Sequence, residues 1–219
     1  GKRDRTARIR ALADRLAASH GLDCQCLLTD RPGGAEALSR ALAEAGESVR
    51  LYVCGGDGTV HEAANGLAGF SNAAMTVIPT GTGNDFLKNF GPDAAKFSDP
   101  ENLWDGPEFP LDLIDCNGRL CLTIACSGID ARIADTVHRY GSLPLLSGRG
   151  SYLLSVAVNV LFKPIGRRWR VELDGEVLED DFALVSVCNG RYYGGGSMPV
   201  PEARMDDGML HTILVKNVP

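Results

Sequence analysis

Hydrophobic and polar residues follow a helical spacing at the start of the chain. Between residues 6 and 19, Ile9, Leu12 and Leu16 recur every three or four positions, and the arginines of this segment stand between them. This spacing predicts an amphipathic helix. Gly21 directly follows the periodic segment and is expected to cap the C-terminus of that helix.

The pattern then alternates between strand and helix up to about residue 80. Short runs of apolar, aromatic and β-branched residues predict strands, and the segments between them predict helices. The strands are expected at 24–28, 50–54 and 76–78, and the helices at 35–45 and 59–66. Strands that alternate with helices through short glycine turns are typical of βαβ units around a parallel sheet.

The second half of the chain has a different pattern, richer in antiparallel strands. Asn117-Gly118 and Asp174-Gly175 each stand between two strand-like runs and predict hairpin turns. Further strands are expected at 183–188 and 209–215, and helices at 129–140 and 151–162. We therefore expect an α/β domain over residues 1–110 and a β-rich domain over residues 111–219.

The composition excludes several classes of protein. The chain is 44% hydrophobic and 23% charged with a net charge of −6, which is ordinary for a soluble globular protein and disfavours nucleic acid as a partner. No apolar run reaches the roughly 18–20 residues that span a bilayer. Seven cysteines without a C-x-x-C pair predict free thiols in a reducing compartment, not a disulfide framework or a zinc site. Glycine is abundant, with 26 residues gathered in a few loops.

The first glycine-rich loop, Gly55-Gly56-Asp57-Gly58, stands between a predicted strand and a predicted helix. Glycines let backbone N–H groups approach an anion, and a helix N-terminus adds partial positive charge. Thr59 is expected to be the N-cap of that helix. A carboxylate in a phosphate-binding loop requires a bridging cation, so Asp57 indicates a metal-bound phosphate. The alternative is an ordinary tight turn between strand and helix.

A second loop of the same kind runs from Gly81 to Asp85 after the next predicted strand. Loops at the carboxyl ends of neighbouring parallel strands meet at one edge of the sheet, where open α/β sheets bind ligands. Asp57 and Asp85 would then form a site for a divalent cation and a nucleotide. Two unrelated turns remain the alternative.

Further motifs accompany these two loops along the chain: Gly55–Thr59, Glu62, Asn65-Gly66, Gly81–Phe86, Leu111-Asp112, Asn189-Gly190, Gly194–Gly196 and Pro201 to Leu210. In this order, they resemble the diacylglycerol kinase catalytic domain family, and bacterial soluble lipid kinases are the most similar members. Sphingosine kinases and NAD kinases share the first loop, but NAD kinases lack the second in this form. The resemblance implies a Rossmann-like three-layer α/β domain followed by an NAD kinase-like β-sandwich.

The resemblance also assigns roles to residues of this chain. Asp57, Asp85 and Asp112 match the aspartates that organise catalytic Mg²⁺ in the family. Asp207, with the backbone carbonyls of Arg204 and Met209, matches a second, structural Mg²⁺ loop, for which a simple turn is the alternative. The expected ATP contacts are Thr29, Gly55, Gly56, Asp57, Gly58, Thr59, Val60, His61 and Thr82. His61 stands where the family commonly has asparagine.

The function that the resemblance implies is ATP- and Mg²⁺-dependent transfer of the γ-phosphate to a hydroxyl of diacylglycerol or a related lipid. A sphingoid-base kinase of the same fold and an inactive nucleotide-binding regulatory module are the alternatives. The expected partners are ATP and a lipid substrate, met by a cytoplasmic protein at the membrane surface; a homodimer is left open.

Two further features concern the membrane and the ends of the chain. The apolar segment 151–162, followed by Lys163, Arg167, Arg168 and Arg170, suits either contact with an anionic lipid surface or a buried helix. Family members also have a strand and a phosphate loop before this chain begins, and the general base after it ends. We therefore expect a fragment truncated at both ends, with little activity alone.

Overall fold

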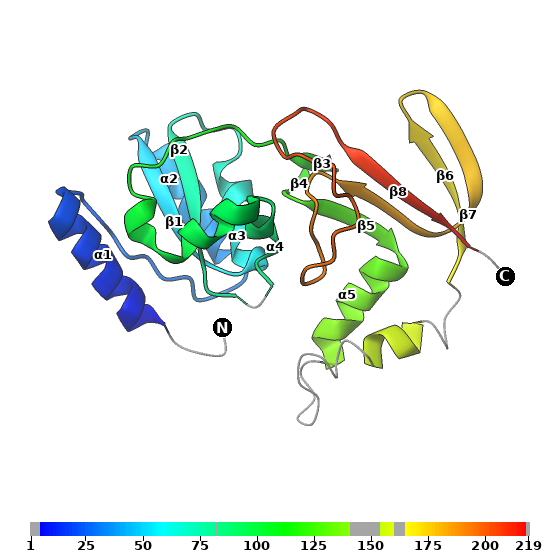
Figure 1. Ribbon diagram of the computed structural model, residues 1–219, viewed down its shortest axis with the longest axis horizontal. Coiled ribbons are helices and arrows are strands. Elements are labelled where there is room, and N and C mark those ends of the chain that lie inside the picture. Colours follow the sequence, from blue (N-terminus) through cyan, green and yellow to red (C-terminus); the bar gives the residue numbers. More distant parts are fainter. Residues whose placement is uncertain (1–4, 82, 141–153, 160–164, 218–219) are drawn as a thin grey trace. The chain divides into compact units, whose positions relative to one another are not determined.

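A computed structural model of the protein describes residues 5–81, 83–140, 154–159 and 165–217 (Figure 1). The chain divides into two units. The first contains Gly1–Thr123 and Asn189–Met209, and the second contains Ile124–Cys188 and Leu210–Pro219. The division falls after the boundary expected at residue 110, and residues 189–209 return to the first unit. No hydrophobic pattern in the sequence indicated this return.

The first unit is built around two parallel strands. Strand β1 pairs with β2 in register from Val49↔Ala73 to Gly55↔Pro79, as expected for a βαβ unit. The bounds of the elements are α1 (Thr6–His20), α2 (Gly34–Glu44), β1 (Val49–Gly55), α3 (Asp57–Leu67), β2 (Ala73–Pro79), α4 (Asp85–Lys88), the 3₁₀ helices η1 (Gly91–Ser98) and η2 (Pro100–Asn102), β3 (Ile114–Cys116) and β4 (Arg119–Cys121).

Two details of the sequence prediction were wrong. The strand expected at 24–28 is not formed by the described residues, since this segment has no strand partner and Leu27 and Leu28 are about half exposed. Helix α3 begins at Asp57 with Gly56 as its N-cap, so Thr59 is not the cap. Thr59 instead lies against Gly55, where a Cβ atom would come within 2.4 Å of the threonine Cβ. The helix end at Gly21 is confirmed by its left-handed φ of 64°.

The core of the first unit lies on one face of the strand pair. Leu51 and Val53 alternate along β1, and their register partners Met75 and Val77 extend the same apolar face on β2. These residues pack with a cluster that contains Val60, Ala63 and Ala64 of α3, Phe86 and Leu87 of α4, Leu122 and Met205. Burial of this cluster fixes α3 and α4 against the strand pair.

Asn65 and Gly66 hold α3 between a helix and a hairpin. A Cβ atom on Gly66 would lie 2.4 Å from the backbone oxygen of Glu36, so only glycine permits this approach of α2 to α3. The buried Asn65 pairs with Leu120 of β4 as a strand would: it donates to the Leu120 carbonyl at 2.9 Å and accepts from its N–H at 3.0 Å. The Asn-Gly pair of the family motif therefore has a packing role here.

The second unit is an antiparallel sheet with β7 (Glu176–Cys188) at its centre. Strands β5 (Ile124–Gly128), β6 (Arg167–Leu173) and β8 (His211–Lys216) all pair with β7, and helix α5 (Ile129–Tyr140) follows β5. Both predicted hairpin turns are confirmed, because Asn117-Gly118 and Asp174-Gly175 have positive φ angles between paired strands.

Part of the apolar segment 151–162 is described, as a helical stretch at residues 154–159. Ser155 and Asn159 are fully buried there and bond to Thr136 of α5. These contacts agree with the buried-helix interpretation for this stretch; the rest of the segment and Lys163 lie outside the described residues. Among the residues that the structure describes, no helix has the length and apolar character to cross a membrane.

The parallel register brings the two glycine loops into contact at the carboxyl ends of β1 and β2. The N–H of Thr80 donates to the Gly55 carbonyl at 3.0 Å, which extends the pairing beyond the strands. A Cβ atom on Gly81 would lie 2.5 Å from the Gly56 Cα, and one on Gly56 would lie 3.1 Å from the Gly81 Cα. The loops therefore meet backbone to backbone, with no room for a side chain between them.

This contact predicts different effects for two glycine-to-alanine substitutions. Gly81→Ala should lower the free energy of unfolding by about 1–3 kcal/mol, because the Gly56 backbone must move. Gly58→Ala should leave stability within about 0.5 kcal/mol or raise it, since no atom lies within 4 Å of the added Cβ and alanine favours the helix. Urea unfolding of both variants tests this, and equal losses would contradict the close contact.

Candidate functional site

Asp57 connects the first glycine loop to the second. Its side chain is exposed at the start of α3, and its Oδ1 accepts a long hydrogen bond of 3.4 Å from the N–H of Phe86 in α4. Its Oδ2 lies against Gly83, where a Cβ atom would come within 2.7 Å. The expected meeting of the two loops is therefore present, with one carboxylate between them. Thr82, expected beside ATP, lies outside the described residues.

Among the described residues, no side chain caps the N-terminus of α3. No side chain bonds to its first turn in the described structure, and the first bond within the helix runs from the N–H of Val60 to the Gly56 carbonyl. The N–H groups of Asp57, Gly58 and Thr59 therefore have no partner inside the helix. Open N–H donors and the helix dipole attract an anion to this place. The side chain of Val60 is buried in the core.

The N-terminus of α2 differs because a carboxylate occupies it. Glu62 of α3 accepts from the N–H of Gly33 at 2.9 Å and from that of Ala35 at 3.1 Å. Thr29 lies in the same loop and touches Gly34, whose Cβ would come within 3.3 Å of the threonine Cβ. The sequence identified Glu62 only as part of a motif. It could not show that the carboxylate reaches Gly33 and Ala35, which lie 29 and 27 positions earlier in the chain.

Asp85 is buried and binds two groups of the chain. Lys88 forms an ion pair with its Oδ1, and the N–H of Gly195 donates to its Oδ2 at 2.7 Å. Gly194, Gly195 and Gly196 all have positive φ angles, which explains the run of three glycines in this loop. One helical turn beyond Asp85, Asn89 accepts from the N–H of Arg191 at 2.7 Å. The second glycine loop is thereby joined to the returning segment 189–209.

Asp112 holds the acidic loop of the same returning segment. Its Oδ2 accepts from the N–H of Gly208 at 2.7 Å, and its own N–H donates to the Met205 carbonyl at 2.8 Å. The buried Asn189 donates to the Asp112 carbonyl at 2.7 Å. The three predicted aspartates therefore each contact a different glycine-containing loop: Gly83, Gly195 and Gly208 are their respective neighbours.

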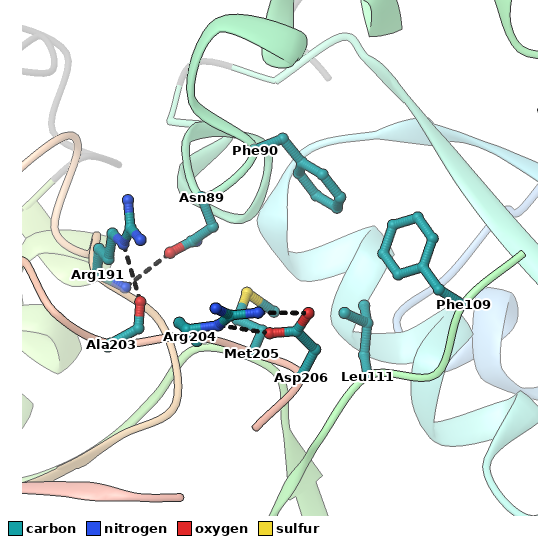
Figure 2. A pocket seen from close by; sticks show the side chains of 9 residues that line it. All are labelled: Asn89, Phe90, Phe109, Leu111, Arg191, Ala203, Arg204, Met205 and Asp206. Atoms are coloured by element: carbon teal, nitrogen blue, oxygen red, sulfur yellow. Dashed lines mark hydrogen bonds and ion pairs between the residues drawn. The ribbon is translucent and has the colours of Figure 1, made fainter. Parts of the chain in front are cut away.

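A small pocket lies beside this acidic loop (Figure 2). It measures about 250 Å³ and has an apolar wall that includes Phe90, Phe109, Leu111 and Met205. The Arg204 guanidinium donates to both carboxylate oxygens of Asp206, from Nε to Oδ1 at 3.1 Å and from Nη2 to Oδ2 at 3.3 Å (Figure 2). The Arg204 side chain is thus paired within its own loop, and a metal contact through its backbone carbonyl stays a prediction.

The oxygen donors of the first unit suit a metal that binds with few protein ligands. Among the described residues, no group of three or more His, Cys, Asp or Glu side chains is placed to hold a metal ion. Mg²⁺ in phosphoryl-transfer sites needs only one or two carboxylates, with phosphates and water as its other ligands. Buried amide oxygens of Asn84 and Asn189 have no hydrogen-bond partner in the described structure and are further acceptors near Asp85 and Asp112.

Asp207, expected in a second metal loop, bonds within its own turn. Its Oδ1 accepts from the N–H of Met209 at 3.0 Å, and Gly208 has a φ of 71°. This is the local bonding of a simple turn. A metal held by Asp207 and the carbonyls of Arg204 and Met209 stays a prediction.

His61 contacts Arg119 of the β3–β4 hairpin. Its Nε2 accepts from Arg119 Nε at 3.3 Å, and Arg119 also pairs with Glu36 of α2 at 2.6 Å. Burial lowers the pKa of His61 and Arg119 lowers it further, while Glu36 and Glu62 oppose the shift. His61 is thereby kept neutral and directed toward the hairpin, so an ATP contact through its side chain would require this hydrogen bond to break.

The second unit contains a larger pocket of about 440 Å³ at the end of β5. Ile165, Trp169 and Phe182 supply apolar and aromatic surface, and Arg132 and Arg167 supply positive charge. The remaining lining residues are Cys126, Ser127, Gly128, Ala131 and Gly166. Its volume is within the range of small-molecule sites, and its lining suits an apolar ligand with a polar end.

The lowered pKa of His61 predicts a pH dependence of stability. In the unfolded chain His61 has a pKa near 6.5 and binds a proton more readily than in the folded protein. The stability that depends on neutral His61 is therefore fully present above pH 6.5 and is lost as the pH falls through the lower pKa of the folded state. We expect the free energy of unfolding of His61→Asn to fall less than that of the wild type between about pH 7.5 and pH 5.5. Urea unfolding at several pH values measures this, and parallel curves would contradict it.

Comparison with known proteins identifies two sequence families along the chain. Residues 1–116 match the family described as "Diacylglycerol kinase catalytic domain". Residues 123–219 match the "YegS C-terminal NAD kinase beta sandwich-like domain". These matches confirm the expected combination of an α/β domain and a β-sandwich.

Similar proteins are named as lipid kinases. A "Probable lipid kinase YegS-like" of Pseudomonas aeruginosa is 33% identical over 165 residues, which cover 73% of this chain and 52% of that protein. A protein of the same name from Pseudomonas fluorescens is 32% identical over 224 residues, which cover 96% of this chain and 69% of that protein. This chain thus spans about half the length of several relatives.

The fold is similar to a solved structure titled as a diacylglycerol kinase from Bacillus anthracis str. Sterne, with a TM-score of 0.71. That structure is 29% identical, and the similarity covers 99% of this chain and 70% of the other. The glycine loops, their shared sheet edge and these matches lead to the same family. The chain belongs to the diacylglycerol kinase catalytic domain family, with a YegS-type β-sandwich region.

Proposed function

We propose that the protein is an ATP- and Mg²⁺-dependent lipid kinase that transfers the γ-phosphate to a hydroxyl of diacylglycerol or a related lipid. The observation that carries the proposal is the uncapped N-terminus of α3 beside two glycine loops that meet backbone to backbone. Family membership supports the same activity.

The phosphates of ATP would lie against the N–H groups of Asp57, Gly58 and Thr59. These groups have no partner inside the helix, and the space above Gly58 is free of other atoms within 4 Å. Donors fixed before the ligand arrives stabilise phosphate charge without reorganising, which favours in-line transfer of the terminal phosphoryl group. The helix therefore binds and orients the nucleotide.

Mg²⁺ would supply charge neutralisation on the phosphates. Asp57 is the carboxylate best suited to hold it, since the side chain is exposed at the start of α3 and contacts both glycine loops. Asp85 and Asp112 would organise the surroundings of the metal through the loops at Gly195 and Gly208. The structural Mg²⁺ loop at Asp207 belongs to the same proposal.

The lipid would place its hydrocarbon part in the pocket of the second unit. Trp169, Phe182 and Ile165 offer apolar surface for the chain, and Arg132 and Arg167 offer positive charge for polar or anionic groups of a lipid layer. An apolar lining discriminates weakly among hydrocarbons, so the pocket fits a class of lipids. A cytoplasmic protein that works at the membrane surface is part of this proposal.

Nucleotide binding by wild type and Asp57→Asn tests the proposal. Mg²⁺·ATP should raise the melting temperature of the wild type, and the Mg²⁺-dependent part of that rise should be lost in Asp57→Asn. Asp93→Asn is the matched control, because Asp93 is an exposed carboxylate paired with Lys96 on η1. Mg²⁺·ATP that fails to stabilise the wild type, or that stabilises Asp57→Asn equally, would contradict the proposal.

The lipid class is tested by phosphoryl transfer in vesicles. We expect transfer of phosphate to diacylglycerol to exceed transfer to sphingosine when each is presented in vesicles of the same composition. Preference for sphingosine would instead assign the protein to the sphingoid-base kinases.

A further inference from the structure

We propose that Glu62 is a positioning residue for the nucleotide, which fixes the loop over residues 29–35 beside the phosphate-binding turn of α3. This rests on the proposed function, because it concerns how the same ATP site is built. Glu62 itself contacts no phosphate in this account. It acts through the loop that contains Thr29, which its two hydrogen bonds hold in place.

Both carboxylate oxygens of Glu62 are committed to the loop. Oε1 accepts from the N–H of Gly33, the N-cap of α2, and Oε2 accepts from the N–H of Ala35 in its first turn. Hydrogen bonds to an ionised group are about twice as strong as neutral ones. Gly33 has a φ of 79°, so the turn that presents these two groups suits glycine. One side chain thus fixes the backbone at two points.

The position of Glu62 on α3 brings the loop close to the open donors. Glu62 follows Gly58 by four residues and therefore lies on the same face of the helix. Side chains lean toward the helix N-terminus, so the carboxylate reaches back in the direction of the first turn. Thr29 touches Gly34 inside the loop that Glu62 holds. Glu62 therefore ties the loop that contains Thr29 to the face of α3 on which Gly58 lies.

The same contact makes the N-termini of α2 and α3 differ in how available their N–H groups are to an anion. The carboxylate occupies the N-terminus of α2, whereas no side chain of the described structure caps the N-terminus of α3. Glu62 already occupies the donors at the start of α2, whereas the N–H groups at the start of α3 remain open to a phosphate, whose repulsion by Asp57 a bridging cation would remove. In this proposal the loop at 29–35 would contact the part of the nucleotide that carries no phosphate, so loss of Glu62 would weaken that contact selectively.

This selectivity separates positioning from a general structural effect. Calorimetric titration with Mg²⁺·ATP and with Mg²⁺·tripolyphosphate measures affinity with and without the nucleoside. Glu62→Gln should weaken ATP binding roughly tenfold, the size of one lost charge-assisted hydrogen bond, and leave tripolyphosphate binding unchanged. Glu36→Gln is the matched control: Glu36 is a carboxylate in the first turn of α2 that pairs with Arg119, and both affinities should stay the same.

A second variant guards against a folding defect in Glu62→Gln. Thr29 is exposed, so Thr29→Ala should fold normally and show the same ATP-selective loss. The inference is overturned if Glu62→Gln weakens both ligands equally, weakens neither, or if Thr29→Ala leaves ATP binding intact. A wild-type protein that binds neither ligand would overturn the proposed function as well, so the two failures are distinguishable.

Discussion

The parallel pairing of β1 and β2 is the constraint on which the site depends. It places Gly55 opposite Pro79 and so brings two loops into contact that are separated in sequence by α3. Because Gly56 and Gly81 meet through their backbones, a side chain at either position would displace the other loop. Asp57, Gly83 and Phe86 are then brought together at the start of two helices. A different register would remove this arrangement, since every neighbour at the edge would change.

The acidic residues of the first unit work mainly on the backbone of the chain itself. Glu62, Asp85 and Asp112 accept from N–H groups of glycines at 33, 195 and 208, and Glu62 also accepts from Ala35. Each contact closes a loop that lies far from the carboxylate in sequence. A network of this kind fixes irregular backbone at a site, because hydrogen bonds to ionised carboxylates are stronger than those between neutral groups. None of these three carboxylates bonds to the N–H groups of Asp57, Gly58 and Thr59 at the start of α3.

Much of the fold could be predicted from the sequence, because local chemistry determined it. The helix end at Gly21, the hairpin turns at Asn117-Gly118 and Asp174-Gly175 and the parallel pairing of the first strands all have short-range signals. The role of Thr59 was mispredicted, since a threonine near a helix start can pack against a glycine as well as cap. The strand at 24–28 was mispredicted because a pattern of apolar residues does not supply a partner strand.

Long-range contacts of the site had no such signal. The ion pair of Asp85 with Lys88 joins residues one helical turn apart and could be anticipated. The hydrogen bond of Asp85 with Gly195 joins residues 110 positions apart and could not. The same holds for Glu62 and the loop at Gly33, and for His61, which contacts a hairpin at Arg119. The sequence identified these residues as members of motifs. Which backbone each one holds depends on the tertiary arrangement.

The central claim is that the open N-terminus of α3 binds phosphate while that of α2 is already occupied. Backbone amide NMR during titration with Mg²⁺·ATP tests it most directly, because each helix start has its own signals. The account predicts the largest shift changes at Asp57, Gly58 and Thr59, with Gly33 and Ala35 remaining bonded to Glu62. Unchanged signals at 57–59, or the largest changes at Gly33 and Ala35, would contradict it.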